Sequence, residues 1–256
     1  MAKKMTKSQK KKLASLILTL ILAAILLTGY LLRDKIPFLR DLFGGNEPPY
    51  QHITLDEIPE YSGEVYVVIN SNVPFFTQEE MKTTSFEFYS DLDSLGRCGV
   101  AFACIGTDIQ PAQGEDRGDI GNVSPSGWKN NNKRYDTDLV DGGWIYNRSH
   151  LIGWQLTAEN DNKKNLITGT RYFNVEGMLP FENMVDDYLE EYPTNHVMYR
   201  VTPIYDGNNL VASGVLMEAY SVEDNGEAVQ FCVYVYNFQP GITINYATGD
   251  NWQTPN

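Results

Sequence analysis

The most regular hydrophobic feature of the chain is an apolar run near its N-terminus. Residues 13–32, LASLILTLILAAILLTGYLL, contain no charged side chain over 20 positions. About 20 apolar residues in a helix span the ~30 Å hydrocarbon core of a bilayer, and a helix satisfies its own backbone hydrogen bonds where lipid offers none. The run therefore predicts a transmembrane helix over 13–32. Its length, and the lack of an Ala-x-Ala-like cleavage site after it, favour an uncleaved anchor over a signal peptide.

Strand patterns follow in several places. Residues 64–70 (EVYVVIN) are rich in β-branched side chains, and residues 99–106 (GVAFACIG) are apolar throughout, as buried strands are. Residues 143–156 are expected to form a strand followed by a turn or the start of a helix. After residue 195, three strand-like runs are separated by turn sequences at 206–209 and 224–226, which predicts an antiparallel meander.

Two segments show helical patterns. Residues 77–90 are expected to form a short helix, because Thr77 and Glu80 have the spacing of a capping box. Residues 165–193 are expected to be mostly helical, with Pro180 breaking or restarting the helix. Apolar residues recur there at helical spacing, at Phe181, Met184, Val185, Tyr188 and Leu189. Together these elements predict an α+β fold with a mainly antiparallel sheet.

The charges at the N-terminus orient the chain in a membrane. Residues 1–12 carry six lysines and no acid, which places them in the cytoplasm by the positive-inside bias. Residues 33–57 contain glycines and prolines that break any long element, so we expect a linker there. Residues 58–256 are then an extracellular domain, long enough for one hydrophobic core. The expected protein is a single-pass protein of the cell membrane.

Composition adds that the outer part of the chain is acidic. The chain has 20 basic and 33 acidic residues, and without the six N-terminal lysines the formal charge is −19. The mean field of such a body repels polyanions, which counts against nucleic-acid binding over the body as a whole. Cys98 and Cys104 are close enough in sequence for a local disulfide or for two thiols on one strand, and an odd count with Cys232 leaves at least one thiol outside any internal bridge. No cysteine or histidine spacing typical of a zinc site occurs.

Candidate chemistry gathers in YNRSHLIGWQL, residues 146–156. Hydrolysis of a phosphodiester requires a base for water, neutralisation of the charge on phosphorus and stabilisation of the leaving oxygen. The neutral imidazole of His150 suits the first task. Arg148, two residues away on a strand, points to the same face and can clamp phosphate oxygens. Asn147 precedes them, and a divalent metal can serve the third task.

Oxygen donors for such a metal follow in KNLITGTRYFNVEGMLPFEN, residues 164–183, at Asn165, Asn174 and Glu182. Mg²⁺ prefers oxygen ligands and keeps several waters, so one amide or carboxylate can hold it. A separation of eight on a continuous helix turns about 800°, which would put Asn174 and Glu182 on one face. Each residue alone also has a structural interpretation: a helix cap for Asn174, a solvated helix face for Glu182, and an ion-pair partner for Arg148.

The segments YNRSHLIGWQLTAEN, KNLITGTRYFNVEGMLPFEN, YRVTPIY and YNFQPGITINYATG resemble the DNA/RNA non-specific endonucleases of the ββα-metal, or His-Me finger, type. The chain is similar to secreted or membrane-anchored nucleases that Gram-positive bacteria use for DNA uptake, over roughly Ile58 to Asp250. The resemblance implies a ββα-metal core within the α+β fold. It also implies that His150 is the general base, Asn174 the direct ligand of Mg²⁺ or Mn²⁺, and Glu182 an acid that holds metal-bound water, with Arg148 near the phosphate.

The chain departs from the family motif of aspartate, arginine, glycine and histidine at two positions. Asn147 replaces the aspartate and Ser149 replaces the glycine. A second sequence, DRGD at 116–119, matches the first three letters of the motif but ends in Asp119, which cannot be assumed to replace an imidazole base. We therefore expect His150, and not Asp119, to be the base.

The sequence thus predicts a membrane-tethered extracellular endonuclease that needs Mg²⁺ or Mn²⁺ and hydrolyses DNA, and it leaves open whether RNA is cleaved as well. One alternative is a catalytically inactive nucleic-acid receptor or scaffold of an uptake or envelope complex. Another is a metal-dependent phosphodiesterase of small molecules. No protein partner follows from the sequence.

Overall fold

The computed structural model describes residues 53–128 and 131–255, together with seven separate positions between residues 13 and 28. The chain divides into two compact units, Met1–Pro49 and Tyr50–Asn256. The seven N-terminal positions are helical, but the predicted transmembrane helix over 13–32 otherwise lies outside the described residues. Among the residues that the structure does describe, none belongs to a helix of the length and apolarity needed to cross a bilayer.

The second unit is built on a six-stranded antiparallel sheet with the strand order β1-β8-β7-β6-β3-β2. Its strands are β1 (Tyr66–Val68), β2 (Phe86–Tyr89), β3 (Ala101–Ile105), β6 (Val197–Ile204), β7 (Gly214–Ser221) and β8 (Gln230–Tyr236). The meander predicted for the C-terminal third is confirmed as β6-β7-β8. The strands predicted over 64–70 and 99–106 are confirmed as β1 and β3.

Two smaller antiparallel pairs complete the β structure. They are β4 (Tyr146–His150) with β5 (Leu166–Thr170), and β9 (Ile242–Ile244) with β10 (Asn251–Gln253). The helical elements are short except for the last: η2 (Leu55–Glu57), η3 (Asn70–Asn72), α3 (Trp154–Thr157), the π-helix η4 (Phe173–Met178) and α4 (Leu179–Glu191). The hairpin β4-β5 followed by η4 and α4 is the ββα arrangement that the resemblance implied.

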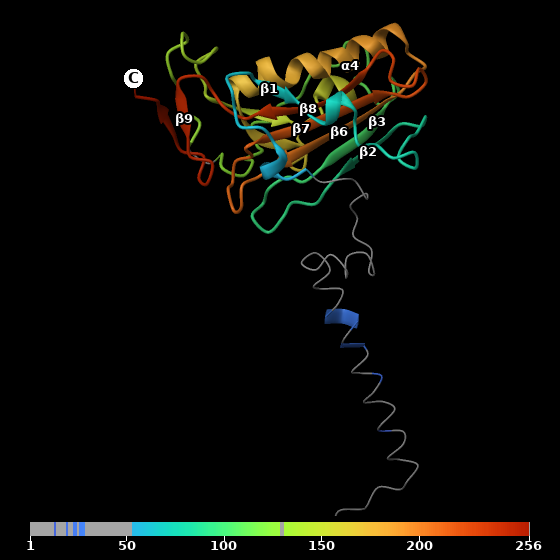
Figure 1. Ribbon diagram of the computed structural model, residues 1–256, viewed down its shortest axis with the longest axis horizontal. Coiled ribbons are helices and arrows are strands. Elements are labelled where there is room, and N and C mark those ends of the chain that lie inside the picture. The colour runs from blue at the N-terminus through green and yellow to red at the C-terminus, as the bar shows by residue number, and fades with distance from the viewer. Residues whose placement is uncertain are drawn as a thin grey trace, which may run out of the picture. The chain divides into compact units, whose positions relative to one another are not determined.

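The main core lies between α4 and one face of the large sheet, and Figure 1 shows α4 lying over the strands. Phe181, Val185, Tyr188 and Leu189 are buried on one side of α4 at the spacing of an amphipathic helix. Met184, expected among them, is 43% exposed. On the other face of the sheet, separate clusters form around Phe102 and Tyr234, and residues Ile53, Leu55 and Ile58 pack against the latter cluster.

The helix predicted over 77–90 is wrong, and the one predicted over 165–193 is wrong in part. In 77–90 the reciprocal hydrogen bonds of a capping box do form, from Thr77 N to Glu80 Oε2 (2.8 Å) and from Glu80 N to Thr77 Oγ1 (3.3 Å), but they close a turn. Phe86–Tyr89 continues as strand β2 because it pairs with β3. Likewise Leu166–Thr170 is strand β5, since its β-branched residues pair with β4. Pro180 lies in the first turn of α4 and does not interrupt the helix that η4 begins.

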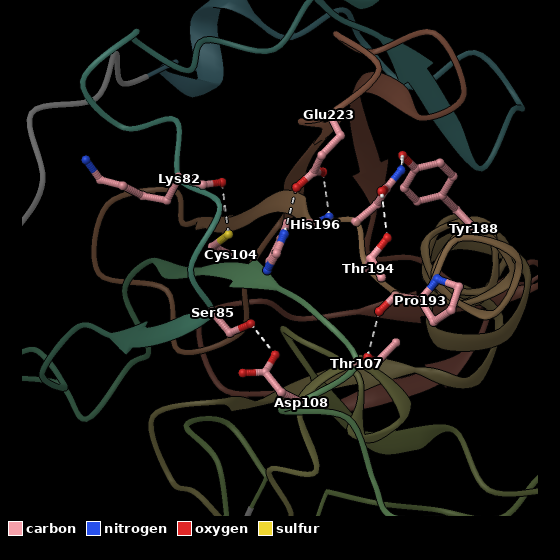
Figure 2. Close-up of polar contacts among 11 residues, drawn as sticks. Lys82, Ser85, Cys104, Thr107, Asp108, Tyr188, Pro193, Thr194, His196 and Glu223 are labelled. Carbon is pink, nitrogen blue, oxygen red and sulfur yellow. Dashed lines mark hydrogen bonds and ion pairs between the residues drawn. The ribbon is translucent and has the colours of Figure 1, made fainter.

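All three cysteines are free and buried. The Sγ of Cys98 donates a hydrogen bond to the carbonyl of Leu166 (3.2 Å) in the main core, whereas Cys104 belongs to the cluster on the opposite face of the sheet. Figure 2 shows the Cys104 thiol donating to the Lys82 carbonyl, at 3.3 Å. The local disulfide left open by the sequence is therefore not formed.

Candidate active site

One cavity of about 640 Å³ brings together five of the six residues that the sequence proposed for chemistry. Asn147, Arg148 and His150 reach it from β4, Asn174 from η4 and Glu182 from α4. They meet because the helix begins soon after β5 ends and returns past the hairpin. The full lining is Arg117, Ile120, Trp128, Asn132, Trp144, Tyr146, Asn147, Arg148, His150, Gly153, Trp154, Gln155, Arg171, Asn174, Val175, Leu179 and Glu182.

The backbone just beyond His150 is held by a buried asparagine. In the β4-β5 pair His150 lies opposite Leu166. The adjacent Asn165 is wholly buried, and its side chain accepts from the backbone N–H of Ile152 and donates to the Ile152 carbonyl, both at 2.9 Å. Asn165, expected as an oxygen donor for a metal, therefore clamps the loop that follows His150 and does not line the cavity.

The hydrogen bonds of His150 fix its tautomer. Its Nε2 lies 2.8 Å from the carbonyl oxygen of Asn160, and its Nδ1 lies 3.1 Å from a guanidinium nitrogen of Arg117. A carbonyl only accepts and a guanidinium only donates, so the proton of the neutral ring is on Nε2 and Nδ1 carries the lone pair. The imidazole is thus oriented by Asn160, with its basic nitrogen on the side of Arg117.

Burial keeps this imidazole neutral. His150 is 7% exposed, and loss of hydration lowers its pKa to about 4. The Asn160 hydrogen bond favours the protonated ring, while the positive charge of Arg117 opposes it. The lone pair on Nδ1 is consequently available as a base throughout the neutral range.

Glu182 is a buried carboxyl at the same cavity. It is 8% exposed, and burial raises its pKa to about 8, an effect that the charge of Arg117 only partly offsets. No ion pair joins it to a basic side chain in the described ranges. Gly153 makes room for it, because a Cβ there would come within 2.9 Å of the Glu182 carboxyl carbon. The site thus holds a carboxyl group that burial keeps largely protonated at neutral pH.

The oxygen donors present fit a hard divalent cation. Asn174 contributes an amide oxygen from a π-helical turn, a rare conformation often found at functional sites, and Glu182 contributes a buried carboxyl group that a bound cation would help to ionise. Mg²⁺ binds through one or two such oxygens and keeps several waters. Within the described residues no group of three or more histidines, cysteines, aspartates or glutamates could hold a metal ion, so the donor set is of this sparse kind.

Arg148 holds a loop at the edge of the cavity. It donates to the backbone carbonyls of Val123 and Gly121, the latter at 2.8 Å, and its guanidinium lies 4.2 Å from the ring centroid of Trp128. The structure therefore places Arg148 beside His150, as the alternation along a strand predicted, and ties it to residues 121–128.

Two arginines of the cavity were not singled out from the sequence. Arg117, from the DRGD segment, contacts His150 Nδ1, and Arg171 follows β5 and pairs with Asp141 at 2.8 Å. With Arg148 they make three arginines against one carboxyl, Glu182, in the lining. The DRGD segment had matched the first letters of the family motif at Arg117, but only the folded loops bring Arg117 and Arg171 to the hairpin. The acidic domain thus carries a locally basic cavity.

Asp119, rejected above as the base, and two other residues whose side chains could serve in chemistry lie elsewhere. Asp119 is exposed and accepts from the backbone N–H of Gly121 (2.7 Å). His196 pairs through Nδ1 with Glu223 at 2.8 Å, in the group of contacts that Figure 2 shows. Arg200 is wholly buried between Glu80 and Glu218, at 2.9 and 2.8 Å, and is a structural ion-pair residue. None of the three lines the cavity.

In a comparison with protein families, residues 78–223 match the family described as DNA/RNA non-specific endonuclease. The match covers more than half of the chain. A deoxyribonuclease of Streptococcus dysgalactiae subsp. equisimilis is 28% identical over 207 residues, or 68% of this chain. The chain spans 62% of the length of that relative.

Solved structures show the same fold. The Sda1 nuclease with bound zinc ion is 30% identical, with a TM-score of 0.58 over 66% of this chain and 81% of that chain. NucA from Streptococcus agalactiae with bound magnesium ion is 24% identical, with a TM-score of 0.63 over 82% of this chain and 91% of that chain.

Proposed function

This chain belongs to the DNA/RNA non-specific endonuclease family, and we propose that it is an active endonuclease that hydrolyses internal phosphodiester bonds of DNA, with RNA as a second substrate to be tested. One observation carries the proposal: a neutral imidazole, two oxygen donors for a metal and three arginines line a single cavity. Contacts to phosphate carry no sequence information, so cleavage is expected at many sequences.

His150 is the general base of the proposed reaction. Its Nε2–H donates to the Asn160 carbonyl, which leaves Nδ1 to accept a proton from water. Arg117 now donates to this same nitrogen. A phosphate in the cavity competes for the guanidinium, since an anion is a stronger acceptor than a neutral imidazole. Arg117 would then neutralise charge on phosphorus, and Nδ1 would face the attacking water.

Asn174 and Glu182 are the residues that would hold the metal, Asn174 directly and Glu182 through water. A divalent cation held there would supply positive charge for the phosphate and for the departing 3′ oxygen. Hard oxygen donors favour Mg²⁺ or Mn²⁺, and related structures contain magnesium or zinc. Asn147, next to Arg148 on β4, stands where the family motif has an aspartate and brings an uncharged amide to the cavity.

The test is a plasmid-nicking assay with the full-length chain in detergent. With Mg²⁺ or Mn²⁺, wild type is expected to convert supercoiled plasmid to the nicked form. In EDTA this cleavage is expected to stop. His150→Ala and Asn174→Ala are each expected to lose at least a hundredfold in rate, within the range for loss of an acid–base or electrostatic group. His196→Ala is the matched control, because His196 pairs with Glu223 away from the cavity, and it should cleave like wild type.

The same assay decides against the receptor alternative. An intact plasmid after incubation of wild type with either metal, together with retained DNA binding, would overturn the enzyme proposal. Equal activity of His150→Ala and wild type would instead remove His150 from the base role.

We propose, further, that residues 13–32 anchor the protein in the cell membrane, with residues 1–12 in the cytoplasm, residues 33–57 as a linker and the catalytic domain outside. The support is the uncharged apolar run and the six lysines before it. Protease added to intact cells should digest the domain and spare an N-terminal tag. Recovery of the whole protein in the cytosolic fraction would refute the anchor.

A further inference from the structure

One aromatic ring at the cavity has no role in the proposed chemistry. Trp144 lines the cavity and is 48% exposed. Trp128 and Tyr146, which also line it, are buried in a hydrophobic cluster with Ile145. A large indole gains most by burial, so an exposed one at the edge of a substrate cavity offers its surface to a ligand.

The backbone around Trp144 is fixed. Trp144 forms an antiparallel bridge with Arg134. On either side, Tyr135 N donates to the Gly143 carbonyl (2.8 Å) and Ile145 N donates to the Lys133 carbonyl (3.1 Å). The next residue, Ile145, is wholly buried. The indole is therefore exposed from a rigid segment, which lowers the entropy lost when a ligand stacks on it.

One face of the ring is covered by a cation. The guanidinium carbon of Arg134 lies 5.6 Å from the Trp144 centroid, within the range of a cation–π contact. The turn before Trp144 uses Gly143 at φ +83°, a backbone conformation that favours glycine. Arg134 thus orients the indole, and the exposed part of the ring remains open to solvent.

The position of Trp144 relates it to the reaction centre. Trp144 lines the same cavity as Arg148 and His150, which follow it on β4 after a bend at Ile145. Six residues of chain between Trp144 and His150 reach at most roughly 20 Å, which is several nucleotides of a bound strand. Three arginines, Arg117, Arg148 and Arg171, line the same cavity and favour a polyanion there.

We propose that Trp144, oriented by Arg134, is a stacking platform for an unpaired base of the substrate, and that the site therefore prefers single-stranded over double-stranded nucleic acid. The inference rests on the proposed function and names its substrate class. Bases inside a duplex are covered on both faces by their neighbours, whereas a single strand can present a base to an aromatic ring. The open face of Trp144 fits the second case.

The test measures binding apart from cleavage. Full-length His150→Ala protein in EDTA is titrated against a fluorescein-labelled oligothymidylate and against a duplex of the same length, with anisotropy as the readout. Trp144→Ala in this background is expected to weaken binding of the single strand about tenfold, within the range for loss of one stacking aromatic. Trp144→Phe, which keeps a ring, should recover most of the loss. Trp252→Ala is the matched control: Trp252 is 47% exposed on β10 and does not line the cavity.

The outcomes separate this inference from the proposed function. Selective loss of single-strand binding in Trp144→Ala, with Trp252→Ala like the parent, supports it even if the wild type proves inactive on plasmid. An unchanged single-strand affinity, or an equal loss for duplex and single strand, overturns the stacking platform even if the enzyme cleaves. Melting temperatures of all variants establish that the fold is retained.

Discussion

Glu182 provides the sharpest quantitative test of the site. Burial raises its pKa from 4.5 to about 8, so in the metal-free protein the folded state holds a proton that the unfolded chain releases. For such a group the free energy of unfolding is highest below pH 4.5 and falls as the pH rises toward 8. Glu182→Gln replaces the carboxyl by an uncharged group of the same shape, so the free energy of unfolding no longer falls with pH at this position.

The size of the effect follows from the two pKa values. Each pH unit between them costs the folded protein about 1.4 kcal/mol, which amounts to roughly 3 kcal/mol at pH 7 and approaches 5 kcal/mol above pH 8. For a domain of this size 1 kcal/mol corresponds to about 2–4 °C in Tm. In EDTA at pH 7 we therefore expect Glu182→Gln to melt roughly 6–12 °C above wild type.

The assay is thermal unfolding of both proteins in EDTA from pH 4.5 to pH 8.5. The two should melt together at the acid end and diverge steadily above it. Glu176, exposed on the preceding helical turn, supplies the control Glu176→Gln, which should track wild type. Mg²⁺ should raise the Tm of wild type more at pH 8 than at pH 5.5, because binding at the cavity favours the ionised carboxyl. Parallel wild-type and Glu182→Gln curves across the whole range would refute a carboxyl buried without a compensating cation.

Other parts of the site and fold make further predictions. Arg117→Gln removes a charge that lowers the pKa of His150, so the acid limb of the variant's plot of kcat/KM against pH should move to higher pH. An unmoved limb would exclude the contact between Arg117 and His150 in solution. Gly169→Ala should lower stability by about 1–3 kcal/mol through overpacking, because its Cβ would come 2.2 Å from Ser149 Oγ and 2.6 Å from the Phe173 ring. In thermal melts Ser149→Gly should recover part of that loss, and no recovery would place the strain elsewhere. Finally, a maleimide dye should label no thiol of the native protein within minutes and three after denaturation, since all three cysteines are buried and free; rapid labelling of one, or fewer than three in denaturant without reductant, would contradict this.

The departures from the family motif become understandable in the structure. Ser149, in place of glycine, is accommodated because Gly169 on β5 leaves the space that its hydroxyl occupies. That hydroxyl is buried without a hydrogen-bond partner in the described part of the chain, which marks it as a packing substitution. Asn147 keeps its place in the cavity lining beside Arg148.

Local sequence determined much of this protein. The meander β6-β7-β8 followed from apolar runs separated by turn residues, and the buried side of α4 from helical spacing at Phe181, Val185 and Leu189. Such periodicities report which face of an element is buried, because burial of apolar area is what selects them. The chemistry at His150, Asn174 and Glu182 could likewise be proposed from residue types and spacing, helped by a family resemblance.

Only the tertiary structure decided the rest. Leu166–Thr170 looked like part of a helix and became a strand, because pairing with β4 outweighs local propensity. The capping box of Thr77 and Glu80 closes a turn and does not start a helix, since Phe86–Tyr89 pairs with β3. Arg117 reached His150 across 33 positions of chain, and the acidic domain acquired an arginine-lined cavity that its net charge opposes. Net charge and secondary-structure propensity are properties of the sequence and ignore which segments meet. A site is made by contacts between distant segments, and these contacts exist only after the chain has folded.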